Sequence, residues 1–269
     1  MNVFMYVLHE FEAAVGKCVA STPYSNESAI HAWDEGVAFY SGYLSGVDGA
    51  QGGKMVYALA EKRGGDFGTE VGDVSQVNSD LADLFAKGRD HFDAAQCDAA
   101  EKTLKKVKRI IYIPLIQGAL KYAYKMEVTP NDEKAVAEGI AFMHAVLPRI
   151  HAADPAAAAT IYSNMSTYSD GCDFDAVKAA FESTYKSLGI ECDQVGGYFD
   201  GDGDKYFFEP CIDCKNSKTK TFTYESNKMT CKDLMKLSNK EEKNICADVS
   251  KARKHCAKAC KECVINNSK

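Results

Sequence analysis

The chain has 269 residues, 46% of them hydrophobic, which is enough for one large or two modest globular domains. Its net charge of −6 argues against nucleic-acid binding, and the absence of an apolar run of about 18 residues argues against a membrane span. The sequence contains no nucleophile elbow, zinc-protease or phosphate-loop motif, so we expect a binding protein and not an enzyme.

Charge is distributed unevenly along the chain. Residues 1–214 carry 18 Lys and Arg against 32 Asp and Glu, whereas residues 215–269 carry 14 against 6. The acidic part favours metal ions or cationic partners. The basic part suits an anionic glycan, a membrane surface or the acidic part itself, or it is an ordinary solvated lysine-rich face.

The first half of the chain has apolar residues at helical spacing. The pattern predicts helices over residues 2–19, 29–44 (with Ser28 as N-cap), 54–63 and 77–94. Glycine-rich residues 45–53 form a predicted loop, and Trp33, Phe39 and Tyr40 are expected in the core. Met1 opens directly into the first helix without a charged leader, so we expect a processed or truncated form that lacks its N-terminal part.

The second half repeats this order of elements. It predicts a long helix over 99–127 kinked at Pro114, then helices over 131–148, 155–166 and 174–188. The hexapeptide at 35–40, EGVAFY, recurs at 138–143 as EGIAFM. We therefore expect an all-α body over residues 1–205, built from two repeated four-helix modules at about 1–96 and 97–192.

Residues 206–269 form a predicted basic, cysteine-rich module. Seven of the eleven cysteines lie there, which indicates disulfides and an oxidising compartment: Cys211, Cys214, Cys231, Cys246, Cys256, Cys260 and Cys263. Zinc at the pair Cys211 and Cys214 is the alternative. Cys18, Cys97, Cys172 and Cys192 can form further bridges, and one of the eleven must remain over. Sequons at Asn26, Asn164 and Asn266 are compatible with a secreted glycoprotein.

The closing spacing of this module, C-x3-C-x2-C, resembles that of the small toxin-like domain first known from a sea-anemone potassium-channel blocker. The segment KMTCKDL at 228–234 is similar to versions attached to algal extracellular proteins. The resemblance implies three bridges among six cysteines. Here there are seven cysteines, so Cys211 or Cys214 pairs elsewhere.

Hard-oxygen and imidazole side chains cluster in the first two helices. One face of a predicted helix presents His31, Asp34 and Glu35 at i, i+3 and i+4. His9 and Glu10 offer a second group, with Tyr40, Tyr57 and Glu61 on the next turns. Carboxylate, phenolate and imidazole suit iron, so we predict a metal site here. Alternatively, His31 only hydrogen-bonds at the start of its helix, and the repeated Glu-Gly is a packing device.

Aspartates at alternate positions over residues 200–204 match part of a calcium loop. The glycine and glutamate that such a loop needs at its sixth and twelfth positions are missing, so a Gly/Asp turn is the alternative.

Five segments together resemble the algal iron-assimilation family, also described as low-iron-inducible periplasmic proteins: residues 31–49, 52–64, 112–125, 138–150 and 173–189. The resemblance implies a secreted or cell-surface protein of an alga that binds or assimilates iron. The alternative is a structural or interaction protein of a surface assembly, which contacts a protein or glycan partner through its cysteine-rich tail.

Overall fold

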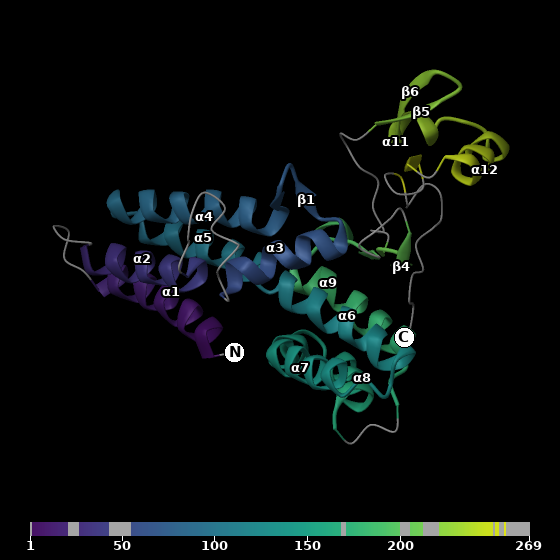
Figure 1. Cartoon of the computed structure of the whole chain (residues 1–269). Helices are drawn as coiled ribbons and strands as arrows, with labels where there is room; N and C mark the ends of the chain where they lie inside the picture. The colour runs from purple at the N-terminus through teal and green to yellow at the C-terminus, as the bar shows by residue number, and fades with distance from the viewer. Residues whose placement is uncertain are drawn as a thin grey trace. The chain divides into compact units, whose positions relative to one another are not determined.

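The structure is a computed structural model that describes residues 2–20, 27–42, 55–167, 171–199, 205–211, 221–249, 251–252 and 256. The chain divides into two compact units, Met1–Glu209 and Pro210–Lys269. Helices make up most of the described chain (Figure 1), so the expected all-α class is confirmed.

The first unit is built from helices that pack mainly against their neighbours in the chain. These are α1 (Asn2–Ala20), α2 (Glu27–Ser41), α3 (Val56–Phe67), α4 (Gln76–Asp93), α5 (Cys97–Ile110), α6 (Ile113–Val128), α7 (Glu133–Ala153), α8 (Pro155–Met165), α9 (Phe174–Leu188) and α10 (Cys192–Val195). Two antiparallel hairpins accompany them: β1 (Glu70–Val71) with β2 (Val74–Ser75), and β3 (Tyr198–Phe199) with β4 (Tyr206–Phe208). Helix α3 packs against α2, α4 and α6, and so links the early helices to the later ones.

The predicted long helix over 99–127 is wrong. Helix α5 ends at Ile110, and a new helix, α6, begins at Ile113 with Pro114 in its first turn. Proline has no N–H to donate, which costs nothing in the first turn of a helix, where the N–H groups have no partner in any case. Pro114 therefore starts a helix and does not kink one.

An aromatic cluster fills the space between α1, α2 and α4. Trp33 is fully buried, its ring lies 4.5 Å from that of Phe11, and its Nε1 donates to the Phe85 carbonyl at 2.9 Å. Tyr40 is buried as expected, but Phe39 is 38% exposed, so that prediction is wrong. Phe39 is not among the buried residues of α2, and its ring lies 5.9 Å from that of Tyr6 of α1, which is itself exposed.

The repeated Glu-Gly pair marks two close helix contacts. A Cβ at Gly36 would lie 2.6 Å from the Phe11 ring of α1, and one at Gly139 would lie 2.6 Å from Met126 Sδ of α6. Each glycine thus lets its helix approach the preceding one, as the packing interpretation predicts. The division into two repeated modules stays an interpretation.

Disulfides tie the first unit together. Cys18 of α1 bonds Cys97 of α5 across 79 residues, and Cys192 of α10 is also disulfide-bonded. Cys172 is a free thiol in the part of the chain that the structure describes.

The second unit has its own small core. Its described members are Phe222, Cys231, Leu234, Ile245, Cys246, Ala252 and Cys256. They come from the antiparallel strands β5 (Thr221–Tyr224) and β6 (Asn227–Thr230), from α11 (Cys231–Leu234) and α12 (Asn239–Asp248), and from the residues beyond.

One bridge of this module is described in full. Cys231 bonds Cys256, and Cys246 is disulfide-bonded too. Cys214, Cys260 and Cys263 lie outside the described residues. Because the core is small, these bridges stabilise the unit substantially.

Candidate functional site

The predicted metal-binding face of α2 is only partly assembled. His31 Nε2 lies 3.4 Å from Glu35 Oε1, and both side chains are well exposed, at 74% and 45%. Asp34 instead pairs with Arg89 of α4. Asp34 therefore links α2 to α4 and does not form a three-residue metal site with His31 and Glu35.

The second predicted group is also dispersed. His9 is exposed and Glu10 half-buried on α1, while the neighbouring Glu12 pairs with Lys108 of α5. Within the described ranges, no group of three or more His, Cys, Asp or Glu side chains is close enough to hold a metal ion. The candidate calcium loop at 200–204 lies outside those ranges.

Oxygen ligands do converge at a different point, around Glu61 of α3. The Glu61 carboxylate accepts the backbone N–H of Ser75 at 3.2 and 3.3 Å, and it accepts the Asn78 side-chain amide. The Tyr40 hydroxyl donates to Asn78 Oδ1, and Asn78 Nδ2 also donates to the Tyr57 carbonyl at 3.1 Å. Three helices, α2, α3 and α4, thus contribute to this Glu61 cluster.

The local sequence explains why these side chains meet. Tyr57 and Glu61 lie four residues apart, on one face of α3. Ser75 caps α4 by accepting the N–H of Asn78, which fixes Asn78 in the first turn. Gly64 lets α3 approach this cap, because a Cβ there would lie 2.6 Å from Ser75 Cβ.

Burial and the negative charge of Glu61 both act on the two tyrosines. Burial raises the pKa of Tyr40 well above its ordinary value, and the Glu61 carboxylate and Tyr57 raise it further. Burial and the same carboxylate raise the pKa of Tyr57. Both phenols are therefore protonated at neutral pH. The Tyr57 hydroxyl, which is half-buried, has no hydrogen-bond partner among the residues that the structure places.

Sequence reasoning found Tyr40, Tyr57 and Glu61 but missed the α4 residues that complete the cluster. A serine two residues before the predicted helix over 77–94 is a possible N-cap, but a cap does not tell which side chain reaches Glu61.

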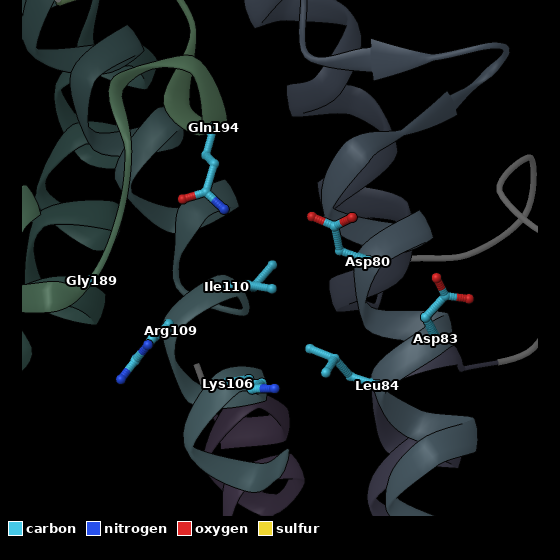
Figure 2. Close-up of a pocket in the computed structure, with 8 residues that line it drawn as sticks. All are labelled: Asp80, Asp83, Leu84, Lys106, Arg109, Ile110, Gly189 and Gln194. Carbon is cyan, nitrogen blue, oxygen red and sulfur yellow. The ribbon is translucent and has the colours of Figure 1, made fainter. Parts of the chain in front are cut away.

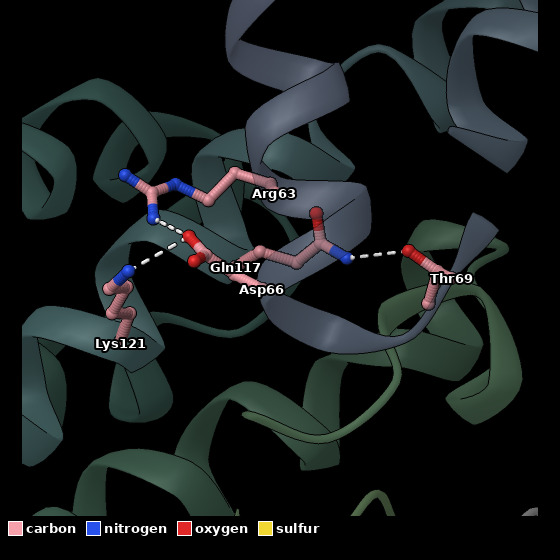
Figure 3. A network of polar contacts seen from close by, with 5 residues as sticks. All are labelled: Arg63, Asp66, Thr69, Gln117 and Lys121. Carbon is pink, nitrogen blue, oxygen red and sulfur yellow. Dashed lines mark hydrogen bonds and ion pairs between the residues drawn. The ribbon is translucent and has the colours of Figure 1, made fainter. Parts of the chain in front are cut away.

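Another polar network lies on the opposite side of α3, between α3 and α6. Asp66 accepts from Arg63 on its own helix and from Lys121 Nζ of α6 at 2.9 Å, as Figure 3 shows. Arg63 is almost completely buried, with its guanidinium 5.4 Å from the centre of the Phe142 ring. Burial lowers the pKa of both Arg63 and Lys121, and Asp66 opposes that shift.

Gln117 lies one helical turn before Lys121 on α6 and makes a second set of polar contacts. Its Nε2 donates to the Val195 carbonyl at 2.9 Å. The same nitrogen donates to Thr69 Oγ1 at 3.3 Å, as Figure 3 shows. These contacts hold α3, α6 and α10 together, so we regard the Arg63–Asp66–Lys121 network as structural.

Comparison with known proteins identifies the group to which this architecture belongs. Residues 2–205 match the model of a protein family described as low iron-inducible periplasmic protein. The chain belongs to the low iron-inducible periplasmic protein family. The match covers the helical unit almost completely, including every residue of the Glu61 cluster.

Membership in this family places the protein in a secreted or periplasmic setting, which agrees with its disulfides. Among the described residues, no helix is both long and apolar enough to cross a membrane. No curated protein and no solved structure matches the chain. The toxin-like character of the cysteine-rich module therefore remains a resemblance.

Proposed function

We infer that this protein binds iron directly, as an extracellular or periplasmic binding protein of iron assimilation and not as an enzyme. The observation that carries the proposal is the Glu61 cluster, which lies within the part of the chain that matches the iron-related family. We assign Tyr57 and Glu61 as iron ligands, with Tyr40 beside them.

The electrostatics of the cluster favour a cation. Burial raises both phenol pKa values, and the Glu61 carboxylate beside them raises both further because it opposes any additional negative charge. A ferric ion at Glu61 would reverse this effect and favour ionisation of Tyr57, whose hydroxyl is not occupied by a described partner. Oxygen ligands of this kind suit a hard metal ion.

Proton release follows from this assignment. Tyr57 is protonated before the metal arrives and must lose its proton to act as a ligand. We therefore expect iron to bind more tightly as the pH rises from 6 to 8 and to release about one proton per ion.

The exposed pair His31–Glu35 is the second candidate position for iron. It offers one imidazole and one carboxylate oxygen 3.4 Å apart. Because it has only two ligands and both side chains are well exposed to water, it can serve only as a weak site. A third ligand would become available only if Asp34 broke its ion pair with Arg89.

The two positions can be separated by matched variants. Tyr57→Phe removes only an oxygen without a described partner, so it should leave the fold unchanged and weaken ferric binding at least about tenfold. The visible absorption band of a ferric phenolate should be lost with it. Tyr162→Phe, an exposed tyrosine of α8, is the control. Unchanged binding in Tyr57→Phe, together with loss in a His31→Ala, Glu35→Ala double variant, would move the site to α2.

The cysteine-rich unit supports a second candidate function, attachment to an anionic surface partner. Its described lysines are exposed on several elements: Lys228, Lys232, Lys236, Lys240, Lys243 and Lys251. Exposed positive charges of this kind attract sulfated or carboxylated glycans. Charge-reversing substitutions at Lys232 and Lys240 should abolish retention on immobilised heparin, and a chelator should not. Retention by these variants at unchanged salt concentration would exclude this function.

A further inference from the structure

A cavity of about 420 Å³ opens between α4, α5 and the segment that follows α9. Its size falls within the roughly 300–1,000 Å³ typical of small-molecule sites. None of the residues that line it belongs to the Glu61 cluster or to the predicted metal-binding face. It is therefore a separate candidate site.

Opposite charges face this cavity from opposite walls. Asp80 and Asp83 lie on α4, and Lys106 and Arg109 lie on α5; Figure 2 shows the Asp83 carboxylate turned away from α5. Within the described chain, neither Lys106 nor Arg109 has an ion-pair partner, so no salt bridge closes the cavity. Asp80 accepts the Gln76 side chain through Oδ1 at 2.6 Å, which leaves its other oxygen available.

The charges lie at opposite ends of the cavity, with apolar side chains between them. Leu84 follows Asp80 by one helical turn, and Ile110 follows Lys106 by one turn. Figure 2 shows Asp80 and Gln194 on opposite sides of the cavity in the upper part of the view, and Lys106 and Leu84 on opposite sides in the lower part. Asp80 and Lys106 lie on different helices, so a ligand that meets both charges must reach across the cavity from α4 to α5.

Contacts outside the cavity hold two further lining residues in place. Gln194 accepts the Glu191 N–H at 2.8 Å through its Oε1, which leaves its amide nitrogen available as a donor to a ligand. Arg109 lies directly over Gly189, where an added Cβ would approach Arg109 Cδ to 3.0 Å. The basic wall is thus fixed at the α9–α10 connection.

We propose that this cavity binds a small aliphatic amino-carboxylate, a zwitterion whose ammonium meets Asp80 and whose carboxylate meets Lys106. Its charges are separated by a short methylene chain that packs against Leu84 and Ile110. Arg109 adds positive charge at the carboxylate end. A ligand with only one charged group would satisfy only one wall, so the cavity selects for both. This proposal is independent of iron binding.

Calorimetric titration of the intact, disulfide-bonded protein with 4-aminobutanoate tests this site. We expect saturable binding, and binding at least about tenfold weaker for butanoate and for butylamine, which each keep one of the charges. Lys106→Met and Asp80→Asn should each weaken binding about tenfold or more. Lys102→Met, on the exposed face of α5, is the matched control and should change nothing.

Three results would overturn the proposal. The first is that 4-aminobutanoate does not bind at millimolar concentration. The second is that butanoate binds as tightly as 4-aminobutanoate. The third is that Lys106→Met and Asp80→Asn both bind 4-aminobutanoate as tightly as the wild type. Circular dichroism of each variant verifies that the helices are intact, so that loss of binding is assigned to the site.

Discussion

The free thiol of Cys172 is held in its unreactive form by its surroundings. Burial, together with the carboxylates of Glu127 and Asp173, raises its pKa to about 12. Because the thiolate is the nucleophile, we expect iodoacetamide at pH 8 to modify Cys172 slowly in the folded protein. Mass spectrometry over time should show rapid modification only after denaturant is added with the disulfides intact. Equal rates in both states would contradict the described environment.

Buried tyrosines make stability depend on alkaline pH. Burial raises the pKa of Tyr185 well above 10.0, with a further contribution from Glu182. Above pH 10 the unfolded state loses this proton and the folded state keeps it, so the stability contribution present below pH 10 is lost as the pH rises. Tyr185→Phe should therefore show a smaller fall in unfolding free energy between pH 9 and 11. An equal fall in wild type and variant would disprove this assignment.

Single residues also show what a sequence pattern can and cannot predict. Helical periodicity places Tyr40 in the core correctly, but it assigns the adjacent Phe39 wrongly, since one residue corresponds to about 100° around the helix. Asp34 was a reasonable metal ligand by spacing, yet its partner, Arg89, comes from 55 residues away. Spacing along one helix cannot reveal such a distant competitor.

At the scale of elements, the contact between α3 and α6 depends on one carboxylate. Asp66 neutralises both Arg63 and Lys121 in a largely buried position. Asp66→Asn would remove the carboxylate that pairs with both buried cations, so we expect a loss of about 3–5 kcal/mol in unfolding free energy by urea denaturation. Asp90→Asn on the exposed face of α4 is the control and should change stability little. Equal stability of both variants would show that Asp66 is not needed.

Helix packing at α2 and α4 depends on Gly88. An added Cβ would lie 2.1 Å from Cζ2 of the buried Trp33, whereas at Gly16 of α1 it would meet nothing within 4 Å. We expect Gly88→Ala to destabilise the protein by about 1–3 kcal/mol through overpacking. Gly16→Ala should stabilise it by up to about 1 kcal/mol through helix propensity. Thermal unfolding of both variants tests this, and a change of the same sign in both would refute it.

The helices were predictable as elements because each has a strong apolar stripe. Their limits were not, since a helix begins and ends according to caps and prolines. From the sequence alone, Pro114 could either kink a long helix or stand in the first turn of a new one. Because α5 ends at Ile110 and α6 begins at Ile113, Pro114 stands in the first turn of α6. The Glu61 cluster was predictable only in part, because Asn78 reaches it through the packing of α4 against α3.

At the scale of the whole molecule, the two units differ in charge and in how they are stabilised. The helical unit is acidic and has an extensive aromatic core, whereas the second unit is basic and relies on a small core with disulfides. This division suits a protein that binds a cation with one part and an anionic surface with the other. Sequence composition alone anticipated the charge difference, because it requires no knowledge of contacts.

Direct iron binding is the central claim, and a ferric titration of the purified, disulfide-intact protein tests it most directly. Calorimetry and metal analysis by mass spectrometry should show saturable binding near one ion per chain, with proton release and a visible phenolate band. Absence of saturable iron binding across pH 6 to 8 would contradict the claim.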